Sequence, residues 1–397
     1  MKPFFTLLLC CFFSVFSFAQ NEINLNQGSI EQKKYHTTIN YEKTKSKIFV
    51  DVVIEGKTYK FLLDTGAPFA VSQKLYNELK LSIVGKVEVL DASGKSGEMI
   101  ITSVPKLQMG ELTFLNTPGI LFTEATNQIF DCLDIDGIIG SNMLRNSVIQ
   151  FDDRNNKIIV TNDAGKLDLK KIPYQKLTLT QTQSNPFIQI MLKKGNQEAT
   201  DNILFDTGAD GFYEMSVQAY YFLKDRVDVV NTIAESEGSF TWGLHGMTDK
   251  EHQFVLEIPQ LSINGNILKK VQVTTTSSNE SRMGAEILSH AKVTLDYKKK
   301  RFYYEPYEAV DTLSQQIWAI SPTLQNNKMV VGIIWDKQLE SKVNIGDEIL
   351  NFNGIDYQSM EFCDLVRSEN KFSDKKAIIK FKDVHTGAVK TLEINRL

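Results

Sequence analysis

Short apolar runs that end in turn residues dominate the middle of the chain. Runs rich in β-branched and aromatic residues and bounded by Gly, Asn or Asp are typical of strands. In this middle part, helical spacing appears in two brief stretches, 73–79 and 217–223, and a further helix is predicted at 360–367 near the end of the chain. The pattern therefore predicts a mainly β protein with short helices. The clearest predicted strands are 48–54 and 59–63, joined by a turn at 55–57, and 187–192 and 202–205, joined near Gly195.

These predicted strands belong to an internal repeat. The segment 61–67, Phe-Leu-Leu-Asp-Thr-Gly-Ala, recurs at 203–209 as Ile-Leu-Phe-Asp-Thr-Gly-Ala. A repeat that keeps its spacing over a long stretch indicates a duplicated structural unit. The chain is therefore expected to fold as two related β-rich lobes. Further paired blocks at nearly the same separation are 140–144 with 284–288 and 148–152 with 292–296.

In each copy an apolar strand leads into an Asp-Thr-Gly turn. A single Asp-Thr-Gly is a common structural turn, whereas two copies in matching context favour a site. Two carboxylates that share one proton can activate a water molecule and polarise a carbonyl oxygen. Asp64 and Asp206 are therefore the candidate catalytic pair. The predicted supporting residues are Thr65 and Thr207, whose hydroxyls can hydrogen-bond across to the other lobe, and Gly66 and Gly208, which let the backbone turn toward each carboxylate.

Both halves resemble retropepsin-type aspartic proteases, in which two apolar residues precede Asp-Thr-Gly-Ala and a later apolar pair precedes Gly. The later signature is Asp136-Gly137-Ile138-Ile139-Gly140 in the first half and a looser 282–285 in the second. The resemblance covers roughly residues 40–307. It implies retropepsin-like β-barrel lobes, an aspartyl dyad and a flap hairpin over the cleft. Because both copies lie in one chain, the expected arrangement is a bilobal pseudo-dimer similar to the pepsin-like enzymes.

Two segments are candidates to cover the cleft. In the first lobe, 87–90 and 98–101 are predicted to pair as a flap, without the aromatic residue typical of pepsin-like flaps. In the second, Trp242 is a candidate substrate-binding residue, and packing inside a loop is its alternative role. Asp210 follows the second motif, where a negative charge can raise the pKa values of the dyad. A solvated or turn-capping Asp210 is the simpler interpretation.

The last part of the chain, 308–397, does not continue the repeat. Residues 345–350, Ile-Gly-Asp-Glu-Ile-Leu, and 353–354, Asn-Gly, resemble a PDZ domain of the bacterial kind, which implies a small α+β fold. Such domains bind the C-terminus of a peptide as an added strand. The segment 321–327, Ser-Pro-Thr-Leu-Gln-Asn-Asn, stands where the glycine-rich carboxylate loop is expected, but it contains no glycine. A docking or packing role is therefore the alternative to ligand binding.

The N-terminus has the features of a signal peptide. Met1-Lys2 precedes an apolar run at 4–18. Ser17 and Ala19 then place small residues at the two positions that a signal peptidase reads. Residues 1–19 are therefore expected to direct export and to be cleaved, which predicts a secreted or periplasmic protein with no stable membrane insertion. A membrane anchor and a lipoprotein are the alternatives. Residues 20–40 are interpreted as a leader or a first strand.

The cysteines, the histidines and the net charge limit which kinds of site and partner are expected. Cys132 and Cys363 are interpreted as buried small hydrophobic residues in separate domains, with a bridge as the alternative. The five His residues show no paired ligand spacing, so no metal site is predicted, and no cofactor is expected. The net charge of −4, with both signs interspersed, argues against a nucleic-acid partner.

The functional prediction is an exported aspartic endopeptidase that hydrolyses peptide or protein substrates with a water held between two aspartates. The alternative is a non-catalytic protein that binds peptides in the same cleft and in the C-terminal module. The predicted domains are lobe 1 at 41–168, lobe 2 at 169–307 and the PDZ-like domain at 308–397.

Overall fold

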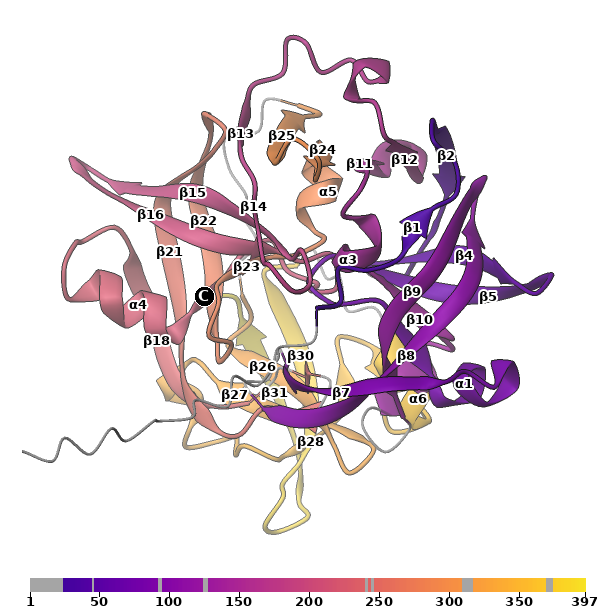
Figure 1. The fold of residues 1–397 in the computed structure, drawn as a ribbon. Helices are drawn as coiled ribbons and strands as arrows, with labels where there is room; N and C mark the ends of the chain where they lie inside the picture. The colour runs from indigo at the N-terminus through magenta and orange to yellow at the C-terminus, as the bar shows by residue number, and fades with distance from the viewer. Residues whose placement is uncertain are drawn as a thin grey trace, which may run out of the picture.

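The structure, a computed structural model, describes residues 24–44, 46–91, 95–123, 128–239, 242–243, 246–308, 317–368 and 374–397. Figure 1 shows a β-rich lobe from each copy of the repeat, side by side, with a C-terminal module below both. The predicted signal peptide, 1–19, lies outside the described residues. Among the helices of the described residues, none combines the length and the apolar character needed to cross a membrane.

Lobe 1 is built on a nine-stranded sheet with the order β1-β9-β6-β10-β5-β4-β8-β7 and with β3 beside β4. The predicted hairpin is present as β4 and β5, whose alternating side chains are buried on the core face. The strands are β1 (Ser29–Ile30), β3 (Glu42–Thr44), β4 (Lys47–Ile54), β5 (Lys57–Asp64), β6 (Ala70–Ser72), β7 (Ile83–Leu90), β8 (Ser96–Met109), β9 (Leu112–Phe122) and β10 (Gly137–Gly140). The helices are α1 (Gln73–Leu79), α2 (Gln128–Cys132) and α3 (Ser141–Leu144).

Lobe 2 repeats this plan in an eight-stranded sheet, ordered β14-β15-β16-β23-β17-β22-β21-β18. Both predicted strands and the predicted second helix are present, as β15, β16 and α4. The strands are β14 (Thr178–Leu179), β15 (Pro186–Lys194), β16 (Gln197–Phe205), β17 (Glu214–Ser216), β18 (Asn231–Gly238), β21 (Glu251–Ile263), β22 (Asn266–Thr276) and β23 (Arg282–Met283), and β19 (Trp242–Gly243) pairs with β20 (Gly246–Met247). The helices are α4 (Val217–Lys224) and α5 (Ile287–His290).

A six-stranded sheet joins the two lobes, in the order β13-β25-β24-β11-β12-β2. Its centre pairs β11 with β24, which are equivalent strands of the repeat, and Gln150 Nε2 donates to Thr294 Oγ1 at 2.9 Å. At its edge, β2 shows that residues before 41 contribute a strand to the fold. The strands are β2 (His36–Asn40), β11 (Val148–Asp152), β12 (Lys157–Thr161), β13 (Tyr174–Lys176), β24 (Ala291–Asp296) and β25 (Arg301–Pro306), and 3₁₀ turns occur at Asp153–Asn155 and Ala164–Lys166.

One hydrophobic core lies behind both Asp-Thr-Gly turns. Phe205, which precedes Asp206, contacts Phe151 of β11 and Phe302 of β25, with ring centroids 6.4 and 5.6 Å away. All three rings are fully buried. Because these rings connect β16 to the sheet that joins the lobes, the core fixes the position of the second turn relative to both halves.

The C-terminal module has its own core and a six-stranded sheet ordered β26-β27-β28-β30-β31, with β29 beside β28. This is a small α+β unit, as the sequence predicted, and its likeness to a PDZ domain remains a prediction. The elements are β26 (Ile320–Gln325), β27 (Lys328–Ile334), β28 (Glu348–Phe352), β29 (Ile355–Asp356), α6 (Phe362–Arg367), β30 (Lys376–Lys382), β31 (Val389–Asn395) and a 3₁₀ turn at Lys337–Leu339.

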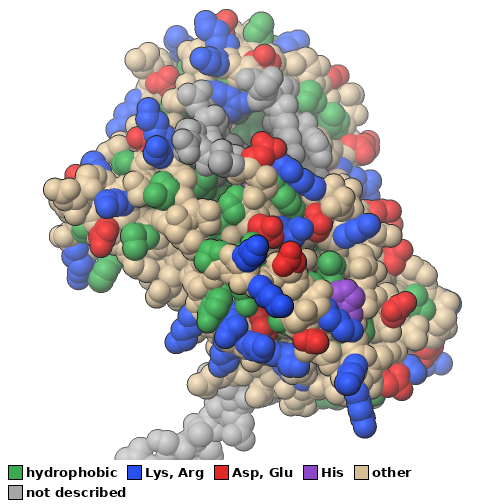
Figure 2. All heavy atoms as spheres, turned by 90° about the horizontal axis from the view of Figure 1, so that it is seen from above, with side chains coloured by type: hydrophobic (Ala, Val, Ile, Leu, Met, Phe, Trp, Pro, Cys, Tyr) green, Lys and Arg blue, Asp and Glu red, His purple; other side chains and the backbone are tan. Residues whose placement is uncertain are grey.

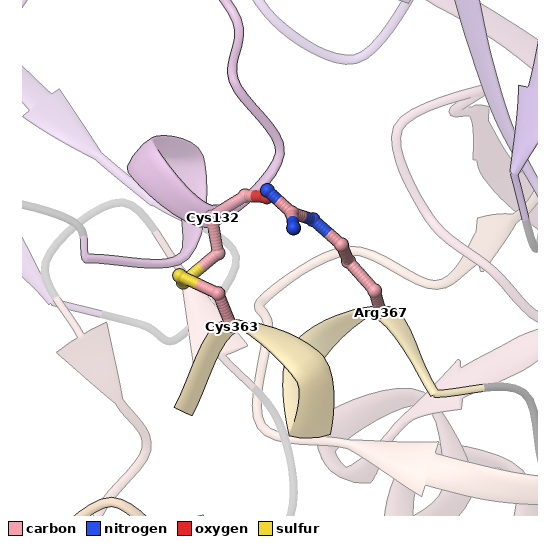
Figure 3. Close-up of a disulfide and its surroundings, with 3 residues drawn as sticks. All are labelled: Cys132, Cys363 and Arg367. Carbon is pink, nitrogen blue, oxygen red and sulfur yellow. A yellow bond between two sulfur atoms is a disulfide. The ribbon is translucent and has the colours of Figure 1, made fainter. Parts of the chain in front are cut away.

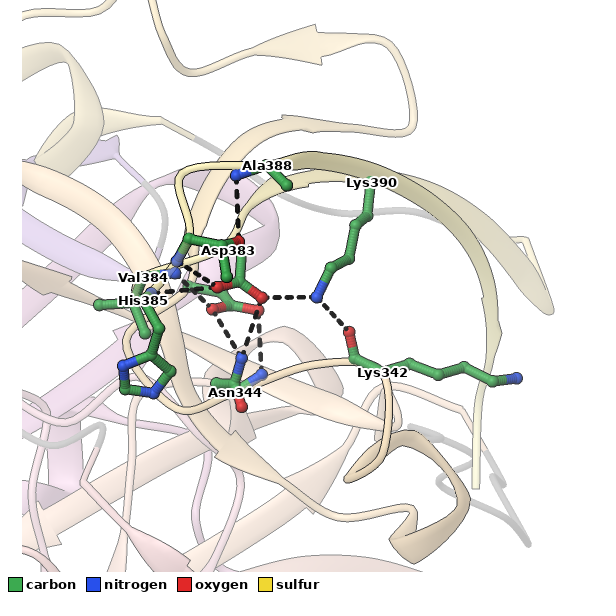
Figure 4. Close-up of polar contacts among 9 residues, drawn as sticks. Lys342, Asn344, Asp383, Val384, His385, Ala388 and Lys390 are labelled. Carbon is green, nitrogen blue, oxygen red and sulfur yellow. Dashed lines mark hydrogen bonds and ion pairs between the residues drawn. The ribbon is translucent and has the colours of Figure 1, made fainter.

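Two buried carboxylates hold the loops of this module (Figure 4). Asp347 accepts from the backbone N–H groups of Asn344 and Val384, each at 2.9 Å. Asp383 pairs with Lys390 at 2.6 Å, and this ammonium group holds the pKa of Asp383 well below its usual range. The Gly-Asp motif at 346–347 therefore has a structural role, because it ties the turn before β28 to the loop between β30 and β31.

The module is docked on lobe 2 through a close backbone contact and an apolar cluster. A Cβ added to Gly238 would lie 2.3 Å from the carbonyl oxygen of Gly332, so only glycine fits there. Val255 of β21 packs with Ile333 and Trp335, which are buried. These contacts make the module part of one body with lobe 2.

A disulfide between Cys132 and Cys363 fastens the module to lobe 1, which shows that the prediction of two separate buried thiols is wrong. Figure 3 shows α2 and α6 meeting at this bond, where the Cα atoms lie 4.7 Å apart. Arg367 reinforces the contact, since its Nε donates to the carbonyl oxygen of Cys132 at 2.6 Å. Local sequence cannot reveal this pairing, because only the docking of the module brings residues 231 positions apart together.

Replacing Cys363 by Ala is expected to lower the free energy of unfolding by roughly 2–5 kcal/mol, because the bridge closes a very long loop in the unfolded chain. Denaturant titration of the oxidised protein and the variant measures the difference. As a control, reducing the native protein should reproduce the stability of the variant. Mass spectrometry that finds no linked peptide containing both cysteines would contradict the assignment.

The surface carries charges of both signs. Figure 2 shows Lys and Arg side chains interspersed with Asp and Glu over one face of the molecule. Several of these charges form exposed pairs, such as Lys86 with Glu98 at 2.5 Å and Lys376 with Glu393 at 2.6 Å. Exposed pairs of this kind contribute little to stability.

Candidate active site

The two Asp-Thr-Gly turns lie at equivalent places in the two lobes. Asp64 ends β5, and the parallel strand β10 places Gly140 beside it. Asp206 directly follows β16, which runs parallel to β23. A Cβ on Gly140 would lie 2.1 Å from the carbonyl carbon of Pro68, so the glycine lets β10 approach the loop after the first motif. This close approach explains the apolar-apolar-Gly signature of the sequence.

Thr65 and Thr207 hold the two turns together, as predicted. The N–H of Thr65 donates to Thr207 Oγ1 at 3.0 Å, and the N–H of Thr207 donates to Thr65 Oγ1 at 3.1 Å. Each hydroxyl in turn donates to a carbonyl oxygen of the opposite lobe, Thr65 to Phe205 at 2.6 Å and Thr207 to Leu63 at 2.9 Å. Both threonines are fully buried. This reciprocal network fixes the register of the lobes at the site.

The glycines of both motifs supply hydrogen bonds to the carboxylates. Asp64 Oδ1 accepts from the N–H groups of Gly66 at 2.8 Å and Ala67 at 3.0 Å. Asp206 Oδ1 accepts from Gly208 at 2.9 Å and Ala209 at 3.2 Å. The backbone therefore orients one oxygen of each carboxyl group and leaves the other available to the cleft.

Asp64 and Asp206 meet across the boundary between the lobes. Their side chains share a hydrogen bond, and each lies over the glycine of the opposite motif. Burial raises the pKa of Asp64 to about 8, with further contributions from the charge of Asp206 and from this hydrogen bond. At neutral pH the dyad therefore retains a proton.

Lys47, at the start of β4, is a site residue that the sequence analysis missed. Its ammonium group donates to the carbonyl oxygen of Gly208 and pairs with Asp210 at 3.0 Å. Burial opposes its charge, but the carboxylates of Asp210, Asp206 and Asp64 keep the pKa of Lys47 above its ordinary value. The Asp210 side chain is 60% exposed, as the solvated interpretation predicted, and it forms an ion pair beside the dyad. The local pattern around Lys47 gives no signal for this role.

Lobe 1 carries the predicted flap. Val87 pairs with Met99 and Leu90 with Ser96, so β7 and β8 form the expected hairpin. Val89 and Asp91 near its tip line the cleft. The corresponding hairpin of lobe 2, β18 and β21, packs against β27 of the module. The backbone of Trp242 lies in β19, next to this hairpin, and its substrate-binding role remains a prediction.

A single cavity of about 690 Å³ contains both aspartates. It is lined by lobe 1, by lobe 2 and by the module. Asn185 also reaches it and donates from Nδ2 to the carbonyl oxygen of Gly66 at 3.2 Å, a contact that the sequence did not indicate. The size is that of a pocket for a ligand with several side chains. Within the described residues, no group of three His, Cys, Asp or Glu is placed to bind a metal ion.

One family of known proteins matches lobe 1. The family described as "gag-polyprotein putative aspartyl protease" matches residues 50–146, which include Asp64 and Gly140. Among solved structures, the aspartic proteinase from Irpex lacteus aligns with 68% of this chain and 97% of its own, at 14% identity and a TM-score of 0.43. No curated protein matches. Lobe 1 is therefore similar to aspartyl proteases around Asp64, and the repeat places the same Asp-Thr-Gly motif in lobe 2 at Asp206.

Proposed function

We propose that this protein is an aspartic endopeptidase that cleaves peptide bonds in peptides or proteins. The observation that supports the proposal most strongly is the pair of carboxyl groups, Asp64 and Asp206, which share a hydrogen bond in a cavity large enough for a peptide. Two carboxyl groups with one proton between them provide both an acid and a base.

The proposed reaction follows from this protonation state. The ionised carboxylate takes a proton from a water molecule, whose oxygen attacks the scissile carbonyl carbon, while the protonated carboxyl group donates its proton to the carbonyl oxygen. The resulting tetrahedral diol collapses when the carboxyl group that took the proton from water gives it to the nitrogen, and the other carboxylate takes one hydroxyl proton of the diol. The C–N bond then breaks to give a carboxylic acid and an amine.

We also propose that the protein is exported, with cleavage after Ala19. The apolar N-terminal run supports this proposal. The disulfide between Cys132 and Cys363 supports it independently, since such bonds persist in oxidising compartments such as the periplasm or the extracellular space. The proposed substrates are therefore peptides or proteins found there.

A peptide-library digest over a range of pH tests the proposed activity. We expect cleavage at neutral pH that declines above about pH 8, because rising pH removes the shared proton that the pair holds through Asp64. The Asp64→Asn protein is the control and should cleave nothing. Peptide binding without cleavage at any pH would instead favour the non-catalytic alternative.

A further inference from the structure

Equivalent positions beside the two aspartates carry apolar side chains in lobe 1 and charged side chains in lobe 2. In lobe 1, Ile138 of β10 pairs with Ala70 of β6. In lobe 2, the equivalent bridge joins Arg282 of β23 to Glu214 of β17. All four residues line the cavity that holds the dyad. At this bridge, the cleft is therefore apolar in lobe 1 and charged in lobe 2.

The apolar side is completed by the C-terminal module. Phe122 and Phe130 of lobe 1 line the cavity, with ring centroids 5.1 Å apart in an edge-to-face contact. Leu324 of β26 and Val366 of α6 line it from the module. The disulfide and the Arg367 hydrogen bond hold α6 in this place. The module thus provides one wall of the apolar pocket.

The charged side is an ion pair between buried Arg282 and partly buried Glu214. Arg282 is 7% exposed, and its Nε donates to Glu214 Oε2 at 2.5 Å. An apolar side chain placed against this pair would remove water from two charged groups without replacing its hydrogen bonds, which is unfavourable. A hydroxyl or amide side chain can donate to the carboxylate of Glu214 and accept from the guanidinium group of Arg282.

We propose that the cleft selects peptides asymmetrically: a large apolar side chain on one side of the scissile bond binds between lobe 1 and the C-terminal module, and a polar side chain on the other side binds at Arg282 and Glu214. This inference rests on the proposed peptidase function. It identifies the substrate as a peptide with an apolar and a polar residue flanking the cleaved bond.

The decisive experiment transfers the lobe 1 residues to lobe 2. Four peptides differ only in their central pair, which is Leu-Leu, Leu-Ser, Ser-Leu or Ser-Ser, and kcat/KM is measured for each. We expect the native protein to cleave one of the two mixed peptides best, by about tenfold over Leu-Leu. The Arg282→Ile/Glu214→Ala variant carries the lobe 1 pair at both positions and should prefer Leu-Leu. Since both charges are removed together, no unpaired buried charge remains to disturb folding.

A matched control removes an ion pair whose residues do not line the cavity. Lys376 and Glu393 pair on the exposed surface of β30 and β31, so the Lys376→Ile/Glu393→Ala variant should keep the native preference. If the lobe 2 variant keeps the native preference as well, or if the native protein cleaves Leu-Leu best, the inference is overturned.

A second pair of variants tests the wall that the module supplies. Leu324→Ala/Val366→Ala enlarges the apolar pocket and should reduce the preference for Leu at the apolar position by about tenfold, without changing the preference for Ser. The control, Ile378→Ala/Val389→Ala, shortens two exposed side chains of the same module and should change neither preference. A loss of preference at the Ser position, or at neither position, would exclude the module as this wall.

Failure of the inference and failure of the proposed function give different results. Cleavage without asymmetry overturns only the inference. If no peptide is cleaved, the proposed function fails, and the Kd values of the same four peptides then decide the inference. A mixed peptide that binds about tenfold tighter than Leu-Leu supports the asymmetric cleft, and four equal Kd values overturn it.

Discussion

Replacing Asp64 by Asn is expected to abolish peptide hydrolysis and, unusually for a buried substitution, to make the protein more stable at neutral pH. Asn keeps the shape of the side chain, and its oxygen can still accept the hydrogen bonds from Gly66 and Ala67. It cannot share an exchangeable proton with Asp206. We therefore expect kcat/KM to fall by about 10³- to 10⁴-fold. Asp206→Asn removes the other half of the pair and should produce a similar loss of activity.

The gain in stability follows from the raised pKa of Asp64. Between its unfolded value near 3.8 and its folded value of about 8, the folded protein binds a proton that the unfolded chain releases. The free energy of unfolding therefore decreases as pH rises through this window. Asn does not titrate, so the variant avoids this decrease. The expected gain is absent below about pH 4 and reaches the order of a few kcal/mol at pH 8.

Thermal unfolding of both proteins from pH 4 to pH 8, together with kcat/KM, measures the two effects. Asp51→Asn is a suitable control, because Asp51 is an exposed residue of β4 in the same lobe, and neither quantity should change. If the difference in Tm between the native and Asp64→Asn proteins is the same at every pH, the two carboxyl groups do not share a proton. Retained hydrolysis in the variant would exclude the proposed mechanism.

The sequence predicted the parts of the fold that a local residue pattern or the internal repeat specifies. β4, β5 and β15 match the predicted strands, and β16 contains the predicted strand 202–205 but begins at Gln197, because β-branched runs ending in glycine turns specify hairpins locally. The repeat predicted the two lobes and the approach of Asp64 to Asp206, since a duplicated unit places equivalent residues symmetrically. It could also predict the crossed threonine hydrogen bonds, because they depend only on the Asp-Thr-Gly motifs.

The position of the C-terminal module could not be predicted, because it depends on contacts between distant residues. The disulfide between Cys132 and Cys363, and the contact of Gly238 with Gly332, form only when the module docks on both lobes. Lys47 was missed for the same reason: its partners, Gly208 and Asp210, lie in the other lobe. A search of the repeat for departures from symmetry would have found Arg282, which stands where the first copy has Ile138.

Gly208→Ala is expected to reduce kcat/KM by about 10²- to 10³-fold while the protein still folds. The reason is that the carboxyl group of Asp64 lies close to Gly208 of the opposite motif. A Cβ at Gly208 would lie 2.2 Å from Asp64 Oδ2 and 2.3 Å from its Cγ. The carboxyl group must therefore move, and it can move into the adjacent cavity. The backbone of Gly208 is not in the left-handed region, so the methyl group acts on Asp64 and not on the turn.

Gly66→Ala and Gly211→Ala make this prediction quantitative. A Cβ at Gly66 would lie 2.6 Å from Asp206 Cγ, so this variant should lose less activity than Gly208→Ala. A Cβ at Gly211, in the same loop as Gly208, comes no closer than 3.9 Å to Glu214 and should have little effect.

Displacing Asp64 also weakens its hydrogen bond with Asp206, so the alkaline limit of the remaining activity should move below pH 8 in Gly208→Ala. Equal activity in all three variants would mean that the carboxyl groups do not lie over the opposing glycines, and the geometry on which the shared proton depends would be wrong.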